Sequence, residues 1–215
     1  MSADTPERSL KQTLRQKRVE FILEAAEEVL LEKGYHDASM DEIATRTGIS
    51  KGTLYQHFST KEELIFALID QSLSRFEQLV GDVAVAPLSV QSKLMHILRA
   101  VYGEQYGLRT QLLRLLQRDE ELYRRLRERK EQLHARLDQA RNQIETILEE
   151  GKSIGVFDPN ISTVLMLHSF LYLLSLKSQE SLFTQKQLSP EETIAQIERL
   201  FFDGIMCKPV PQTDQ

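Results

Sequence analysis

Residues 39–64 read SMDEIATRTGISKGTLYQHFSTKEEL, and this stretch decides the fold. Ser39 and Glu42 form a capping box, in which the serine hydroxyl accepts from the Glu42 amide while the Glu42 carboxylate reaches back, so a short helix begins here. Gly48 ends that helix, and Ser50 is the N-cap of a second short helix. Two helices of about two turns each, separated by a tight glycine turn, predict a helix-turn-helix.

The segments on either side of this motif also predict helices. Residues 11–33 form an amphipathic helix that Gly34 ends. Thr60 and Glu63 form a further capping box, which opens a long connecting helix over residues 61–81. The apolar residues expected to form the small core are Ile22, Ala25 or Ala26, Val29, Ile43, Ala44, Ile49, Leu54 and Phe58.

The composition of the 215 residues favours an all-α protein, because only 9 Gly and 6 Pro interrupt the chain and no stretch has the alternation that β-sandwiches require. Hydrophobic residues make up 41% and charged residues 27%, as in ordinary globular proteins, which excludes a disordered chain. Cys207 is the single cysteine, so an intramolecular disulfide and a multi-cysteine zinc site are excluded. With no recognisable signal peptide or membrane span, we expect a cytoplasmic protein.

Basic residues are concentrated in two windows although the net charge is −5. Neither residues 8–18 nor residues 44–61 contain an Asp or Glu. The acidic residues lie elsewhere, for instance at Glu20, Glu24, Glu27, Glu28 and Glu32. A run of like charge is usually a solvated face, so these windows point to a nucleic-acid surface only in combination with the helix-turn-helix.

The chain beyond Pro87 predicts further helices, over residues 88–106, 110–117, 119–150, 158–178 and 189–206. Asp158-Pro159 and Ser189-Pro190 are typical of helix starts, and Gly151 with Gly155 closes the helix before them. The organisation is therefore a flexible tail at residues 1–10, a helix-turn-helix domain at 11–60, the connecting helix at 61–81, a larger helical domain at 88–206 and a second tail at 207–215.

Residues 17–64 resemble the DNA-binding domain of the TetR family of transcriptional regulators. The matching segments are ILEAA from Ile22, Gly34-Tyr35, MDEIA from Met40, GISKGTLYQHF from Gly48, and KEEL from Lys61. The resemblance implies an all-α protein of about nine helices, a homodimer whose N-terminal part binds palindromic operator DNA and whose C-terminal part binds a small molecule. It implies a ligand-responsive regulator, and we expect a repressor that the ligand releases from DNA.

The second helix of a helix-turn-helix enters the major groove, so its polar residues are the candidate DNA contacts. Lys51, Thr53 and Gln56 are implied at base edges, and Tyr55, His57 and Lys61 at phosphates. Ser39, Arg46 and the basic start of the first helix are further phosphate candidates, Ser50 lies at the helix N-terminus, and Gly52 leaves room for close approach.

The sequence defines the ligand site less clearly than the DNA-binding site. The candidates to line an apolar or aromatic cavity are Phe66, Phe76, Met95, Tyr102, Tyr106 and Phe170, although at helical spacing each also fits an ordinary core. Tyr172 is a further aromatic of this kind. His168 fits a hydrogen-bonded core histidine, and His134 with Asp138 fits a surface pair, so neither a metal nor a cofactor is expected.

The last two helices are the candidate dimer interface. Residues 161–176 are apolar on most faces, and the final helix carries an apolar stripe. The interface candidates are Leu165, Leu173, Ile194, Ile197, Phe201 and Ile205. With the partner's copies these helices form a four-helix bundle.

Two other classes of function are weaker. An enzyme is disfavoured because the chain has no nucleophile elbow, zinc-protease motif or phosphate-binding glycine loop. A helical adaptor fits the heptad spacing from Leu126 to Ile147 but leaves the acid-free window at residues 44–61 unexplained. Both activation and repression are compatible with the sequence, because the sign of regulation depends on where the operator lies relative to a promoter.

Overall fold

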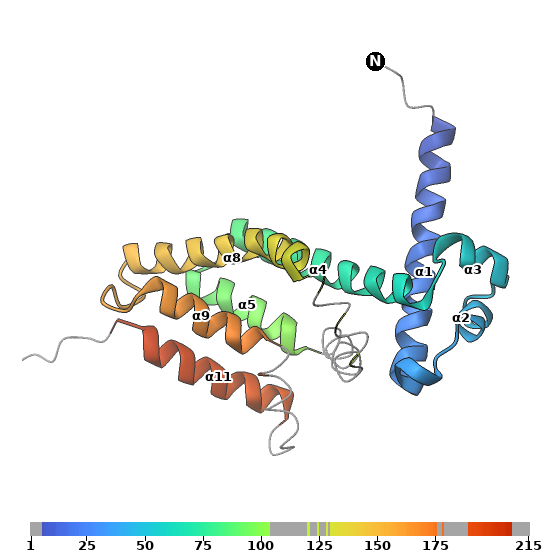
Figure 1. Ribbon diagram of the computed structural model, residues 1–215. Coiled ribbons are helices and arrows are strands. Elements are labelled where there is room, and N and C mark those ends of the chain that lie inside the picture. Colours follow the sequence, from blue (N-terminus) through green and yellow to red (C-terminus); the bar gives the residue numbers. More distant parts are fainter. Residues whose placement is uncertain are drawn as a thin grey trace, which may run out of the picture. The chain divides into compact units, whose positions relative to one another are not determined.

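The computed structural model describes residues 6–103, 130–175 and 189–207 together with residues 120, 124, 128 and 178, and these are helical almost throughout (Figure 1). The helices are α1 (Pro6–Asp37), α2 (Met40–Thr47), α3 (Lys51–His57), α4 (Lys61–Val85), α5 (Val90–Tyr102), α8 (Lys130–Ser153), α9 (Thr163–Leu174) and α11 (Pro190–Ile205). The all-α class is confirmed. The expected helix at residues 110–117 lies outside the described residues, as do most of residues 119–129.

The described residues fall into two compact units, and the division along α4 lies between Ser72 and Leu73. Unit 1 holds α1, α2, α3 and the start of α4; unit 2 holds the rest of α4 with α5, α8, α9 and α11. Among the described residues, we find no helix that combines the length and hydrophobicity needed to cross a bilayer.

Helix α1 supplies one wall of the unit 1 core. Its predicted stripe is buried, with Ile22 and Val29 fully inaccessible, and its helical geometry breaks at Gly34, where φ is 79°. The helix begins at Pro6, so from that residue onward the segment expected as a tail is helical. A proline is well tolerated in the first turn, and no helix-breaking residue follows until Gly34.

Helices α2 and α3 begin and end where the sequence predicts. Ser39 Oγ accepts from the Glu42 amide at 3.2 Å, and Ser50 Oγ accepts from the Thr53 amide at 3.1 Å. Gly48 ends α2 in the left-handed conformation, with φ 69°. The apolar residues behind these helices, Ile43, Ala44, Leu54 and Phe58, are buried, whereas Ile49 is half-buried.

Helix α4 extends past its predicted end. It continues through Gly81 to Val85, because Val80 and Val83 are buried in the unit 2 core and stabilise a further turn. A Cβ at Gly81 would meet only Gln143 Nε2, at 3.7 Å, so this glycine is an ordinary interior residue. The helix ends two residues before Pro87, which cannot continue it.

Unit 2 is a helical bundle in which α8 packs against both α5 and α9, and α11 packs against α5 (Figure 1). Its core contains Leu94, Ile97, Ile144, Leu148 and Phe170. Helix α11 begins as predicted: Ser189 Oγ accepts from the Glu192 amide at 3.2 Å, and Glu192 Oε2 accepts from the Ser189 amide at 2.8 Å.

The predicted boundaries around the α8–α9 connection are wrong. Helix α8 passes through Gly151 and ends at Ser153, and α9 begins at Thr163 instead of Asp158. The reason is Phe157, which is fully buried and lies so close to α8 that a Cβ on Gly151 would stand 2.2 Å from its ring. This burial keeps residues 154–162 out of a helix, in turns on either side of Phe157, and the Asp158 amide donates to the Ile205 carbonyl at 2.8 Å.

The end of the described chain returns to the same connection. Phe157 and Met206 form an isolated antiparallel bridge. The Cys207 amide donates to the Val156 carbonyl at 3.1 Å. The segment after α11 is therefore fixed to the α8–α9 connection.

Candidate nucleic-acid interface

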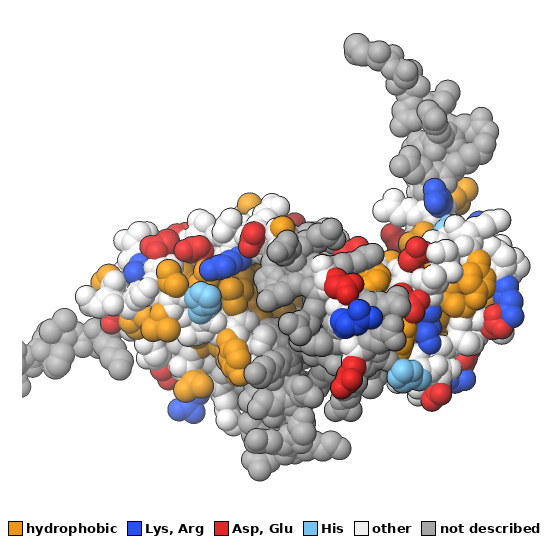
Figure 2. All heavy atoms as spheres, in the orientation of Figure 1, with side chains coloured by type: hydrophobic (Ala, Val, Ile, Leu, Met, Phe, Trp, Pro, Cys, Tyr) orange, Lys and Arg blue, Asp and Glu red, His pale blue; other side chains and the backbone are white. Residues whose placement is uncertain are grey.

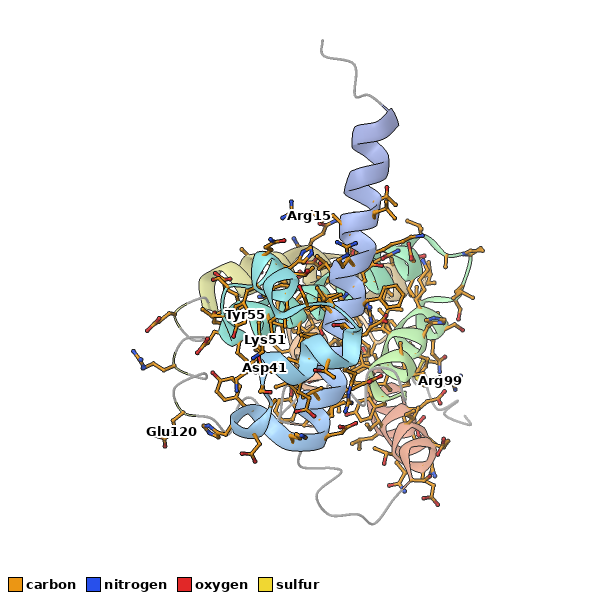
Figure 3. The ribbon with its side chains drawn as sticks, turned by 90° about the vertical axis from the view of Figure 1, so that its right-hand side faces the viewer. Arg15, Asp41, Lys51, Tyr55, Arg99 and Glu120 are labelled. Carbon is orange, nitrogen blue, oxygen red and sulfur yellow. The ribbon has the colours of Figure 1, made fainter. Side chains whose placement is uncertain are left out.

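Helix α3 turns one side into the core and leaves the other exposed. Leu54 is fully buried and Phe58, directly after the helix, is 7% exposed, so the opposite side of α3 faces outward. The predicted contacts are distributed accordingly: Lys51, Gly52, Tyr55 and Gln56 are exposed, and Thr53 and His57 are half-buried. Figure 3 shows Lys51 and Tyr55 on unit 1 together with Arg15 of α1. This edge offers hydrogen-bonding groups that a groove of DNA could reach.

Gly52 has no packing role inside unit 1. A Cβ placed on it would meet only Ser50 Oγ, at 3.9 Å. Glycine in a helix costs about 1 kcal/mol relative to alanine, so this position gives up stability without an internal reason. The backbone of α3 is therefore open to close approach at this position.

Two of the expected DNA contacts, Arg46 at phosphate and Lys51 at base edges, already have carboxylate partners. Arg46 donates to both Glu32 carboxylate oxygens at 2.7 Å each, with Glu28 at 3.6 Å, and Lys51 forms an ion pair with Asp41. The hydrogen bond to Glu32 raises the pKa of Arg46, and the same bond lowers the pKa of Glu32. All of these side chains are exposed, so a phosphate would compete with the carboxylates through solvent.

Lys61 points into unit 1. Its ammonium group donates to the carbonyl oxygens of Tyr35 and Ala38, the latter at 2.8 Å, and lies 4.3 Å from the centre of the Tyr35 ring. The Tyr35 hydroxyl in turn donates to Glu62 Oε1 at 3.2 Å. The first turn of α4 is thus anchored to the chain that follows Gly34.

His57 is the last residue of α3. Partial burial lowers its pKa, and the charges of Arg15 and Arg18 on α1 lower it further. The sequence identified the start of the first helix only as basic in general. The signal for these two arginines was available, since they continue the stripe of Ile22 at helical spacing.

Acidic and basic side chains are interspersed on the face of unit 1 drawn in Figure 2, so the DNA candidates do not form a continuous basic surface there.

The described residues also hold no group of three or more metal-binding side chains. His168 is exposed, not in the core as expected, and the His134 side chain lies outside the described ones.

The expected ligand-cavity residues are dispersed. Met95, Tyr102 and Phe170 are buried in the core of unit 2, and Phe76 packs against that core. The Tyr102 hydroxyl donates to the Leu173 carbonyl at 2.8 Å, and burial raises its pKa. Phe66 belongs to unit 1 and is half-buried, while Tyr106 lies outside the described residues.

The expected dimer residues gather along α9 and α11, where a groove of about 610 Å³ runs between the helices. Leu165, Leu173, Phe201 and Ile205 line it; Ile194 and Ile197 lie farther up α11, the first half-buried and the second buried. Two further residues of the expected apolar faces line the groove, Tyr172 at 56% and Leu200 at 78% exposed. Their exposure could not be recognised from spacing alone, because both fall within apolar stripes.

Comparison with known proteins places the similarity in unit 1. The family model described as "Bacterial regulatory proteins, tetR family" matches residues 22–68. The HTH-type transcriptional activator FasR of Mycolicibacterium smegmatis is 53% identical over 72 residues, which are 34% of this chain and 32% of that protein. The fatty acid metabolism regulator protein of Bacillus subtilis is 34% identical over 73 residues, 33% of this chain and 38% of the relative. The chain thus spans less than two fifths of these relatives' own length.

The whole fold also has solved counterparts. The crystal structure of the transcriptional regulator FadR from Bacillus subtilis in complex with stearoyl-CoA superimposes with a TM-score of 0.65 at 20% identity, covering 86% of this chain and 98% of that one. The similarity at this identity is one of fold.

Proposed function

Because the chain belongs to the tetR family of bacterial regulatory proteins, we propose that it is a ligand-responsive transcriptional regulator that binds operator DNA as a homodimer. The observation that carries the proposal is the outward edge of α3, whose polar residues stand over the buried Leu54 and Phe58. Exposed polar side chains on a short helix of this kind suit the major groove. In this proposal the protein acts by binding DNA in the cytoplasm and not by catalysis.

In this proposal α3 reads the operator. Lys51, Thr53 and Gln56 contact base edges. The backbone contacts are Ser39, Arg46, Ser50, Tyr55, His57 and Lys61, with Gly52 at the closest approach. Arg46 and Lys51 would exchange carboxylates for DNA groups, which costs little because these ion pairs are exposed. Lys61 acts in addition on the position of α4, through its bonds to Tyr35 and Ala38.

The dimer is proposed to form through the groove between α9 and α11. Leu165, Tyr172 and Leu200 expose 61%, 56% and 78% of their surface there, and Figure 2 shows apolar patches on the surface of unit 2. Gly204 lies in the groove with nothing within 4 Å of a Cβ, so an apolar side chain from a second copy has room to enter. A two-fold axis would place α9 and α11 of both copies in one four-helix bundle and would match a palindromic operator.

The effector is proposed to be a long apolar molecule, a fatty acyl thioester being the class to test first. Two comparisons support this class by name, one with the fatty acid metabolism regulator protein of B. subtilis and one with the B. subtilis FadR structure that holds stearoyl-CoA. The candidates to contact the acyl chain of the effector are Phe76, Met95, Tyr102 and Phe170 of unit 2. Phe66 and Tyr106 are also expected there. Repression relieved by the effector is the first candidate. Activation is the second, favoured by the name of FasR.

Coupling between effector and DNA is proposed to pass through α4, which runs without a break from the anchored turn at Lys61 to Val85. The decisive experiment is footprinting of the purified chain on the DNA upstream of its own gene, followed by calorimetric titration of stearoyl-CoA with and without that DNA. If the sites are coupled, the two affinities differ by roughly 5- to 150-fold. No footprint would refute the proposed function; equal affinities would refute the coupling alone.

A further inference from the structure

An outer stripe of exposed side chains runs along α1, on the side away from the unit 1 core. Its members, at alternating spacings of three and four residues, are Leu14, Lys17, Phe21, Glu24 and Glu28. All five are exposed, and Leu14 and Phe21 leave 56% and 66% of their surface uncovered. The stripe therefore contributes little to the stability of unit 1 itself.

A hollow of about 320 Å³ borders this outer stripe, between α1 and the turn that precedes α3. Leu14, Phe21 and Ile49 are among its apolar lining residues. A single exposed hydrophobic side chain is ordinary, but two at a spacing of seven residues beside a hollow are typical of a contact surface. The helix also continues past α2 and α3, so a second helix can lie along it (Figure 1).

The charges of α1 change sign next to Phe21. Residues 8–18 carry five cations and no acid, whereas residues 20–32 carry five acids and no cation. On the outer stripe, Lys17 lies four residues before Phe21 and Glu24 lies three residues after it. Neither of these two charges is paired within the part of unit 1 that the structure describes. The two halves of the stripe are thus complementary in charge to each other.

We propose that α1 of a second copy occupies the outer stripe, antiparallel to the first, with the two Phe21 rings at the centre of the contact. Lys17 of each copy then faces the partner's Glu24, so symmetry gives two such ion pairs. A parallel arrangement would place like charges against one another, and it would also align the helix dipoles unfavourably. The hollow beside Phe21 gives the partner's ring room to enter.

This contact is a second surface of self-association, separate from the groove between α9 and α11, and it competes with DNA. Lys17 belongs to the basic start of α1, which is expected at phosphates, and it cannot serve the partner's Glu24 and a phosphate at once. The pairing itself does not depend on the proposed function; the competition does. Because the contact is small and charged, it is a weak one that salt weakens further.

The test is sedimentation velocity of the full chain over a concentration series, at low and at high salt. It measures any association beyond the species present at the lowest concentration. Lys17→Glu and Glu24→Lys each bring like charges together, and the double variant Lys17→Glu/Glu24→Lys restores opposite charges with their positions exchanged. Phe21→Ser removes the aromatic centre without a change in charge. Arg141→Glu and Glu149→Lys, exposed residues of α8, are the matched charge controls.

Each single reversal should raise the dissociation constant of this association by at least about 2- to 30-fold, the span for two exposed ion pairs, and the double reversal should restore it. Phe21→Ser should also weaken it, and both controls should behave like the parent. The inference is overturned if the parent shows no concentration-dependent association, if the single reversals associate like the parent, or if the double reversal fails to restore the loss.

Fluorescence anisotropy with a short duplex of random sequence separates this inference from the proposed function. At low protein concentration, Phe21→Ser should bind the duplex like the parent, because the substitution changes no charge. If Phe21→Ser instead loses affinity for the duplex while its self-association is unchanged, DNA occupies the stripe and the inference is overturned. If the parent shows no salt-dependent binding to any duplex, the proposed function fails and the pairing of α1 stands.

Discussion

The Lys61 ammonium lies over the ring of Tyr35, 4.3 Å from its centre, and also donates a hydrogen bond to the carbonyl oxygen of that same residue. One side chain therefore satisfies backbone acceptors where α1 ends and fixes the residue at which α4 begins. A lysine at this place in the family pattern is expected to touch phosphate. Here it also holds two helices together.

We expect Lys61→Ala to destabilise unit 1 by about 1–3 kcal/mol, because two part-buried carbonyl oxygens lose their donor. Thermal unfolding followed by circular dichroism checks this. Tyr55→Phe is the contrast: because Tyr55 is exposed, loss of its hydroxyl should weaken binding to all DNA sequences alike and leave unfolding unchanged. An unfolding curve of Lys61→Ala that coincides with the parent's would remove the anchoring role.

Glu32→Gln should strengthen DNA binding. The substitution weakens the bidentate pair with Arg46 and frees the guanidinium for phosphate, so the slope of log affinity against log salt should steepen by up to about one unit. Gel-shift titrations across salt concentrations measure it. Glu149→Gln, an exposed acid on α8, controls for the change in net charge. An unchanged slope would mean that Arg46 does not reach DNA.

Leu200→Asp should abolish the dimer. An unpaired carboxylate buried against a partner costs at least about 3 kcal/mol, which raises the dimer dissociation constant by more than about 100-fold. Light scattering at micromolar concentration distinguishes the states. Val85→Asp is the matched control, since Val85 is 84% exposed and lies outside the groove. A dimeric Leu200→Asp variant would place the interface elsewhere.

Gly151→Ala and Gly81→Ala should act in opposite directions. Both glycines lie inside helices, where alanine gains about 1 kcal/mol of helix propensity. At Gly81 the space is open enough to keep that gain, whereas at Gly151 the new methyl would overlap the Phe157 ring and cost about 1–3 kcal/mol. Urea unfolding of both variants compares them. Equal stabilisation would show that Phe157 can move away from α8.

The features that sequence predicted are those with local causes. The serine caps at Ser39, Ser50 and Ser189 bond to amides three residues away, so their chemistry is visible in a short window. The missed boundary at Asp158 depends on the burial of Phe157 against a helix and on a bridge to Met206, 49 positions along the chain. No local pattern contains that contact.

The candidate site divides in the same way. The outward position of Tyr55 follows from the inward position of Leu54, one residue before it. The partners of Arg46 and Lys61 do not follow from spacing, because Glu32 and Tyr35 reach them only after α1 has folded against α2 and α4. Sequence therefore identified the residues of the edge but not which of them have internal partners.

The segment that returns to the α8–α9 connection provides a natural site for a spin label. Cys207 is exposed, it is the chain's one thiol, and its backbone amide is held by the Val156 carbonyl. A nitroxide attached there needs no engineered cysteine and sits on a fixed stretch of backbone. Double electron–electron resonance would then measure the distance between the two labels of a symmetric dimer, with and without DNA.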